Sequence, residues 1–494
     1  VLTDVNSGSG TMAVSFDLSW NYSWRLSSGI SNWDAMWVFV KYRKNGGDWQ
    51  HASLSNSGHT APSGSTIDIG LRDPASAYNI STNPGVGAFI YKSSAGFGTS
   101  TFNDIKLIWN YYQDGVRQGD PLDVKVFAVH MVYVPQGAFY AGDNGTSAAT
   151  LKQGSNDNDP WYIGSEAAIS VTNSTGTAGG TGNQPTGAAY YYTTDVSPSD
   201  DATGAAFSIP DAFPKGYNAF YVMRYEITQE QWRDFFNSLP TTGSARTNRD
   251  ITSSTNSGKN SDALTDRNNL SWDSSSTSNQ ATLPDRNSPN GETYCNVAMN
   301  YLSWDDLLAY LDWAGLRPMS ELEYEKACRG TAAPVSGEYA WGTTNLTGAT
   351  GFSNTGTVTE VPSNSGAHAA FNNLVTGPAR IGSFASLNYG GASRELSGGG
   401  YYGAMEMSGN TTEATVTFGN STGRAYTGLH GDGSLDSNAS ANVTAWPSSP
   451  GNGSRGGHWN GQSGWLRTSD RAYAAHGVTT RHKARGGRGV RTAP

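Results

Sequence analysis

The first 130 residues alternate between apolar and polar positions with a period of two. Five runs show this pattern, at 12–20, 35–42, 88–91, 105–112 and 123–134. In the second run Val38 and Val40 lie on one face, and Trp37 and Phe39 lie on the other. Clusters of Gly, Asn, Ser and Pro separate the runs. Period-two alternation with turn residues between the runs predicts antiparallel strands packed as an all-β sandwich.

Helical signals begin only after residue 134. Capping boxes start at Thr228, Ser303 and Ser320, and each is followed by apolar residues at helical spacing. Gly315 and Gly330 stand where the second and third of these helices should end, because glycine tolerates the left-handed conformation that terminates a helix. The sequence therefore predicts three short helices in an α+β region.

Long polar stretches interrupt this second region. They cover about 145–205, 240–292, 343–400 and 420–453 and contain much of the Gly, Ser, Thr and Asn of the chain. Loops of this length within a compact domain are uncommon. We interpret them as insertions into a smaller scaffold.

Composition narrows the class of protein. The 494 residues include 61 Gly, and only 15% are charged, against about one quarter in an average soluble domain. The 15 Trp and 25 Tyr argue against a disordered chain. With 32 basic against 41 acidic residues, a nucleic-acid partner is not expected, and no apolar run is long enough to predict a membrane span.

Low charge and abundant small polar residues are typical of an extracellular or cell-surface protein. The sequence begins with Val1 rather than Met, which suggests either a trimmed chain or a removed signal peptide. The two cysteines, Cys295 and Cys328, either pair in one disulfide or lie separately as small buried apolar residues.

Six segments, in order, resemble the formylglycine-generating-enzyme (sulfatase-modifying factor) family. The resemblance divides the chain into a β-sandwich domain at 1–130 and a family domain at 131–494, and it implies a C-type-lectin-like α+β fold with long loops. The matching segments are Met131–Gly142, Phe220–Trp232, Val297–Gly330, Tyr339–Gly342, Gly403–Glu413 and Ser454–Arg491.

The resemblance also implies where the family's chemistry should be. Catalytic members hold copper with two cysteines after an Arg-Gly-Gly-Ser strand, since soft thiolates suit Cu(I). Gly461 and Leu466 occupy the corresponding positions, and His458 replaces the serine. We therefore expect no copper and no enzymatic activity.

A calcium site of the family is retained in part. The segment Gly-Asn-x-x-Glu, here 409–413, places Glu406 and Glu413 as carboxylate ligands, with Gly409 and Thr411 supplying backbone carbonyls. Hard oxygen ligands are those that Ca²⁺ prefers. Glu406 departs from the shorter Asp or Asn that is usual in the family. The alternative is that Glu413 caps a turn and Glu406 is solvated.

The C-terminal strands are where family members bind ligands. The candidate ligand-binding residues are His458, Trp459, Trp465, Arg467 and Tyr473. Aromatic rings suit sugars or peptides, but a packed core strand is the alternative for Trp459 and Trp465. The terminal arginines are expected mainly in core ion pairs.

These observations favour a secreted, non-catalytic structural or adhesion protein. Such a protein would assemble as a homo-oligomer or polymer, for example as the subunit of an extracellular filament or surface layer. The alternative is a lectin-like module that binds a glycan or protein ligand through its C-terminal strands. An enzyme with an unrecognised site ranks last.

Overall fold

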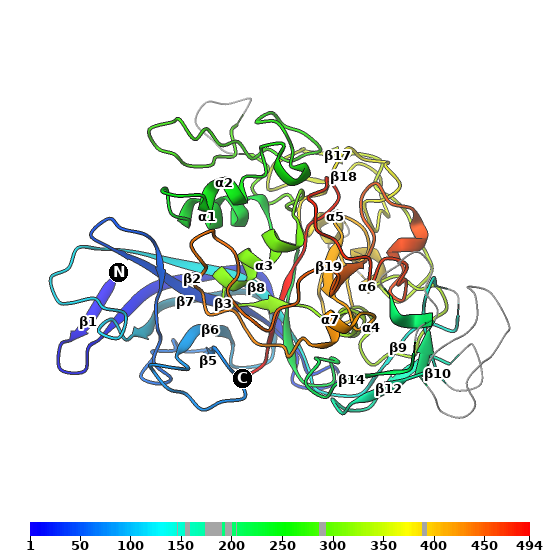
Figure 1. Ribbon diagram of the computed structural model, residues 1–494, viewed down its shortest axis with the longest axis horizontal. Coiled ribbons are helices and arrows are strands. Elements are labelled where there is room, and N and C mark those ends of the chain that lie inside the picture. Colours follow the sequence, from blue (N-terminus) through cyan, green and yellow to red (C-terminus); the bar gives the residue numbers. More distant parts are fainter. Residues whose placement is uncertain are drawn as a thin grey trace.

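The protein is mostly β-sheet with few helices. A computed structural model describes residues 1–145, 147–153, 159–172, 190–192, 200–203, 205–285, 293–387 and 393–494. In Figure 1 the N-terminal strands, in blue, lie at the left, and the later part of the chain lies above them and to their right, with the C-terminus near the lower middle.

Eight strands form the N-terminal part, and the five predicted ones are confirmed among them. β1, β2 and β7 form a three-stranded sheet, and β3, β5, β6 and β8 belong to a larger sheet with β4 at its side. The strands are β1 (Leu2–Asn6), β2 (Thr11–Arg25), β3 (Asp34–Lys44), β4 (Gln50–His51), β5 (Ser65–Leu71), β6 (Gly85–Lys92), β7 (Gly96–Trp109) and β8 (Leu122–Val134).

The two sheets pack face to face, which confirms the sandwich. Val38 and Val40 of β3 belong to one buried apolar cluster with Val14 of β2 and Leu107 of β7. The opposite face of β3, with Trp37 and Phe39, is equally buried, in the main core of the molecule. Because β3 is covered on both faces, the larger sheet is the central layer of the whole protein.

The larger sheet continues into the C-terminal part of the chain. Its order is β16-β21-β15-β8-β3-β6-β5, so β8 pairs with β3 on one side and with β15 (Phe220–Met223) on the other. β21 (Gly489–Thr492) and β16 (Arg317–Pro318) complete it. Residue 130, the predicted domain boundary, lies inside β8, and the strands on either side of it share one sheet.

The three predicted helices form where their capping boxes lie. α1 (Gln229–Ser238), α3 (Trp304–Trp313) and α4 (Glu321–Arg329) each begin with both hydrogen bonds of the box. Gly315 and Gly330 follow α3 and α4 with φ of +67° and +65°, as expected of residues that end a helix. α3 covers the sheet, since the rings of Phe39 and Trp313 lie 5.1 Å apart edge to face.

Short elements occupy the four polar insertions. The first contains β10 to β14, with β11 paired to β9, and its apolar residues join the main core. The remaining elements are β9 (Phe139–Ala141), β10 (Leu151–Gln153), β11 (Trp161–Ile163), β12 (Ile169–Val171), β13 (Tyr190–Tyr192), η1 (Asp201–Thr203), β14 (Phe207–Ile209), α2 (Ala245–Arg249), η2 (Thr255–Ser257), β17 (Phe352–Ser353), β18 (Val361–Pro362), α5 (Ser383–Leu387), α6 (Arg394–Ser397), β19 (Glu413–Val416), α7 (Ser421–Arg424), β20 (Asn452–Arg455) and η3 (Ser463–Leu466).

Two further expectations concern the chain as a whole. Among the described residues, no helix has the length and apolar character needed to cross a bilayer. Cys295 and Cys328 are not joined by a disulfide in this structure, and Cys295 is only partly buried. Cys328 is fully buried on α4 beside Met319 and Tyr324, where it packs as a small apolar side chain.

Candidate functional site

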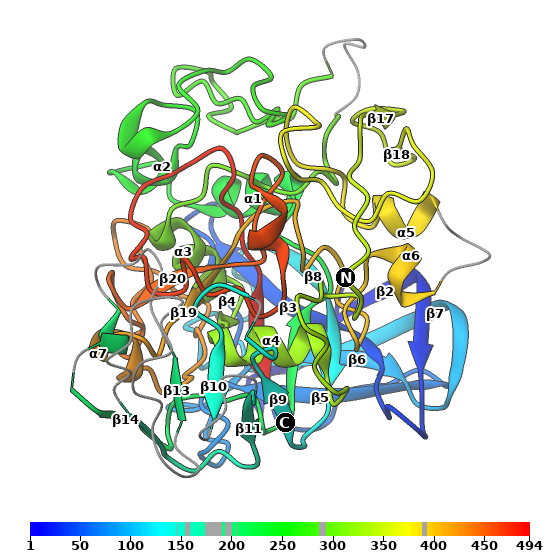
Figure 2. The same cartoon turned by 90° about the vertical axis from the view of Figure 1, so that its right-hand side faces the viewer.

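A pocket of about 210 Å³ opens beside the end of β20. Its wall comes from one stretch of the chain, residues 454–485, together with Thr412. Three of the predicted binding residues line it, namely His458, Trp465 and Tyr473. Figure 2 shows β19, β20 and α4, the elements that support this region, on the side of the molecule that faces the viewer.

Four rings follow one another along the pocket wall. His458 and Trp465 have ring centroids 5.6 Å apart, Trp465 and Tyr473 5.1 Å, and Tyr473 and His476 5.4 Å. The last two pairs meet edge to face, the geometry that aromatic quadrupoles favour. The rings therefore hold one another in place and present a pre-organised aromatic surface.

The charge of the pocket is nearly balanced. Three charged side chains line it, namely Arg455, Asp470 and Arg485. Arg455 is paired with Glu321 and Glu325, so Arg485 and Asp470 leave one further charge of each sign.

Burial, together with the nearby His482 and Arg485, lowers the pKa of His458 to about 4. His458 is therefore neutral at pH 7, and its Nδ1 is buried beside Asn460 and Gly461.

Two of the predicted binding residues lie outside the pocket. Trp459 is only 1% exposed, packs in an apolar cluster with Phe384 and Ala484, and donates from Nε1 to the Lys483 carbonyl at 3.1 Å. Trp459 is therefore a core residue, but it lies in a turn after β20 and not on a strand as the alternative held. Arg467 interacts with the Tyr339 hydroxyl instead of lining the pocket.

His476 also lines the wall and was not among the predicted binding residues. The distribution of histidine could have indicated it, since three of the eight histidines in the chain fall between 458 and 482. His458, His476 and His482 all line the pocket.

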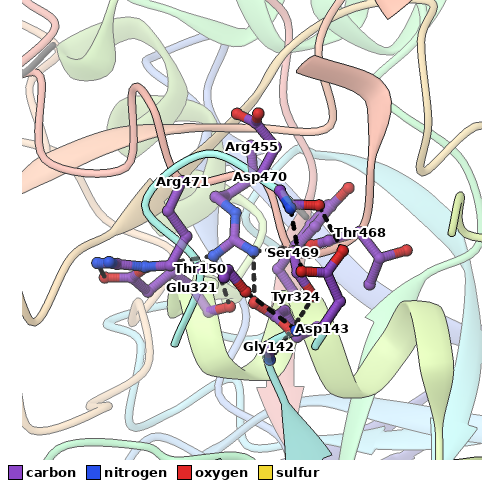
Figure 3. Close-up of polar contacts among 12 residues, drawn as sticks. Gly142, Asp143, Thr150, Glu321, Tyr324, Arg455, Thr468, Ser469, Asp470 and Arg471 are labelled. Carbon is purple, nitrogen blue, oxygen red and sulfur yellow. Dashed lines mark hydrogen bonds and ion pairs between the residues drawn. The ribbon is translucent and has the colours of Figure 1, made fainter. Parts of the chain in front are cut away.

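A buried ion-pair network joins α4 to the chain segment that forms the pocket. Glu321, the first residue of α4, accepts from Arg471 Nε at 2.6 Å and from Arg455 Nη1 at 3.2 Å. Arg455 also reaches Glu325 at 2.7 Å. Figure 3 shows these arginines converging on α4 from the C-terminal segment. All four side chains are fully shielded from solvent, so the network fixes the chain that carries the pocket.

Other terminal arginines are also structural, as expected. Arg481 pairs with Asp306 at 2.7 Å, and Arg488 pairs with Glu413 at 2.7 Å. Arg491 donates to the carbonyls of Gly315 and Leu71 across the sheet.

A second polar cluster lies at the turn 406–413. Glu413 Oε1 accepts from Arg488, and Glu406 Oε1 accepts from the Gly382 amide at 2.9 Å, while the second oxygen of each carboxylate has no hydrogen-bond partner. Glu226 holds the same turn by accepting from the Thr411 amide at 2.8 Å. Burial, with Glu226 nearby, raises the pKa of both Glu406 and Glu413 to about 8. The predicted solvation of Glu406 is excluded, because it is only 4% exposed.

Comparison with known families decides the classification. The sequence model of the sulfatase-modifying factor enzyme 1-like domain matches residues 186–493, more than half of the chain. The chain belongs to this family. The resemblance from 131 onward extends beyond the matched residues, into β8 and β9.

Solved structures of two bacterial proteins are similar to this chain. PvdO from Pseudomonas aeruginosa has 16% identity over 74% of this chain and 95% of its own, with a TM-score of 0.32. Treponema denticola variable protein 1 has 12% identity over 69% and 99%, with a TM-score of 0.26. Scores this low support no statement about function. No curated protein sequence matches the chain.

The residues at the family's copper positions do not fit copper. Leu466 is fully buried against Tyr339 and Trp341. A Cβ atom at Gly461 would lie 2.9 Å from the Trp465 ring and 3.0 Å from the His458 ring, so these rings occupy the space that a cysteine would need. In the described part of the chain, no three His, Cys, Asp or Glu side chains are grouped so that they could hold a metal.

Proposed function

We propose that this family member is a non-catalytic binding protein whose ligand enters the pocket at residues 454–485. The observation that carries the proposal is the replacement at Gly461. Where the family places a copper thiolate, this chain places the His458 and Trp465 rings, which are part of an aromatic wall.

The pocket's lining defines the ligand in chemical terms. Its volume of about 210 Å³ suits one ring-sized group of a larger ligand, such as a single side chain or sugar unit. The rings offer apolar contact, and the His458 ring among them is neutral. Besides Arg455, which is paired with Glu321 and Glu325, Arg485 and Asp470 offer one charge of each sign. A balanced charge disfavours strongly anionic or cationic ligands.

Replacement of Trp465 tests the proposal. We expect fragments with one aromatic or sugar ring to show saturation-transfer signals with the wild-type protein and to lose at least tenfold in affinity with Trp465→Ala, because the central ring of the wall is removed. Tyr140→Ala is the matched control, since Tyr140 is 39% exposed on β9 and lies outside the pocket. If no ring-bearing fragment binds, or if Trp465→Ala binds equally well, the proposal is wrong.

We further propose that the binding protein acts at a surface and self-associates. Apolar side chains project from the three-stranded sheet, with Val5 51%, Tyr22 58% and Phe97 77% exposed. Within the described residues, β1 pairs with β2 alone, so its other edge is open to a strand of another copy. Negative-stain images of the purified protein should show oligomers or filaments. A strictly monomeric protein at high concentration would overturn this second proposal.

We also propose a structural calcium ion at the turn 406–413. The unpartnered oxygens of Glu406 and Glu413 are buried acceptors that a hard cation would satisfy. The family resemblance implies the backbone carbonyls of Gly409 and Thr411 as further ligands of the ion. Arg488 pairs with Glu413, and Glu226 and Glu406 lie close enough to raise the pKa of Arg488. Because the pKa of Glu406 and of Glu413 is raised to about 8, calcium binding would displace protons from these two carboxyls at neutral pH.

Chelation tests the calcium proposal. We expect the melting temperature to rise in millimolar Ca²⁺ relative to EGTA, because a ligand that binds only the folded state stabilises it by about 2.7 kcal/mol at a hundredfold excess over Kd. Glu406→Gln should abolish this difference, and Mg²⁺ should not replace Ca²⁺. Identical melting temperatures with and without chelator would exclude a structural ion.

A further inference from the structure

A second pocket, of about 540 Å³, lies on the large sheet, away from the C-terminal pocket. Its floor is a row of aromatic side chains on neighbouring strands. Tyr221 of β15 is opposite Tyr133 of β8 in the register, and the Tyr133 amide donates to the carbonyl of Trp33, just before β3. Tyr91 of β6 and Asp68 of β5 continue the row.

The rings of this row are fixed in position. Trp33 stacks on Tyr133 at 3.9 Å with the planes 9° apart, and on Tyr91 at 5.4 Å. Trp33 Nε1 donates to the Tyr221 hydroxyl at 3.0 Å, and the Tyr91 hydroxyl donates to Asp68 Oδ2 at 2.5 Å. A ligand would bind without ordering these side chains, which lowers the entropic cost of binding.

Burial differs along the row in a way that suits a binding surface. Tyr91 and Tyr221 are only 6% and 2% exposed and form the base, whereas Trp33 and Tyr133 are half-buried and line the opening. Gln136 and Asn218 are exposed at the rim. The pocket thus combines aromatic rings with one side-chain carboxylate and two side-chain amides, and residues 492–494 complete its lining.

We infer that this pocket is a binding site for neutral carbohydrate. A sugar ring has an apolar C–H face, which packs on aromatic rings, and hydroxyl groups that both donate and accept. The amides of Gln136 and Asn218 do both in return, and Asp68 accepts. The negative charge of the Asp68 carboxylate disfavours an anionic ligand. Arg25, whose guanidinium lies 4.5 Å from the Trp33 ring centre, opposes a cationic one.

Oligosaccharide binding tests the inference. The probes are cellohexaose, chitohexaose, maltohexaose, laminarihexaose and mannohexaose, with a polygalacturonate oligomer and a tetraglycine peptide as charged and peptide controls. By saturation-transfer NMR and titration calorimetry we expect at least one neutral hexasaccharide to bind and both controls to fail. Tyr133→Ala should weaken binding at least tenfold.

Two variants keep the test independent of folding and of the proposed function. Gln136→Ala/Asn218→Ala changes only rim side chains and should weaken binding three- to tenfold with an unchanged melting temperature. The titrations are repeated in a Trp465→Ala background, so that a sugar ring held in the C-terminal pocket does not contribute to the signal. The inference is overturned if, in that background, no neutral hexasaccharide binds, if the peptide binds in their place, or if the rim variant binds normally.

Discussion

Glu321→Gln should lower the free energy of unfolding by about 3–5 kcal/mol. The substitution keeps the size of the side chain but removes the carboxylate that pairs with Arg471 at 2.6 Å and with Arg455 at 3.2 Å. Arg455 retains Glu325, whereas Arg471 loses the acidic partner of its ion pair. An uncompensated buried charge carries a cost of this size.

Chemical denaturation followed by circular dichroism measures the change. Asp123→Asn is the matched control, because it breaks the Arg43–Asp123 pair at 2.6 Å, whose side chains are 39% and 54% exposed. Exposed pairs contribute about 0–1 kcal/mol. If the two variants lose equal stability, the network beneath the pocket is not the structural support described above.

Lowering the pH from 7 to 4 should reduce the free energy of unfolding of the wild-type protein more than that of the His458→Phe variant. The pKa of His458 is about 4 in the folded protein, against an ordinary value of 6.5. Between these values the unfolded chain binds more protons than the folded one. The contribution of neutral His458 to the stability of the folded protein is therefore complete above pH 6.5 and is lost as the pH falls toward 4. We expect a loss of roughly 2–3 kcal/mol at pH 4 from this residue.

The measurement is the free energy of unfolding at pH 7 and pH 4 for both proteins. Phe keeps a ring beside Trp465 but cannot titrate, so the drop from pH 7 to pH 4 should be smaller in the variant by the stated amount. Other buried histidines, His51 and His430, contribute equally to both proteins and cancel in the comparison. Equal drops would show that His458 is not held neutral by burial.

Local features of the fold could be predicted from the sequence. The alternation in β3 indicated two apolar faces, and both are buried. The boxes at Ser303 and Ser320 determined where α3 and α4 begin, because the cap and the residue three positions later interact within one turn.

Non-local features could not be predicted in this way. The pairing of β8 with β15 joins residues about 90 positions apart, and only the register of the folded sheet reveals it.

The residues that line the pocket could likewise be predicted only in part. Trp459 and Trp465 look alike in the sequence, yet one packs in the core and the other lines the pocket, because the chain turns between them. Glu226 reaches the turn at 406–413 from a distant segment.

The most direct test of whether this family member is catalytic is to incubate it with a cysteine-containing substrate peptide, Cu(I) and oxygen. A catalytic member of the family serves as the positive control, and mass spectrometry with oxygen consumption serves as the readout. With Gly461 and Leu466 at the copper positions, the wild-type protein should leave the peptide unchanged and consume no oxygen above background. Formation of formylglycine by the purified protein would contradict the assignment of this pocket to binding alone.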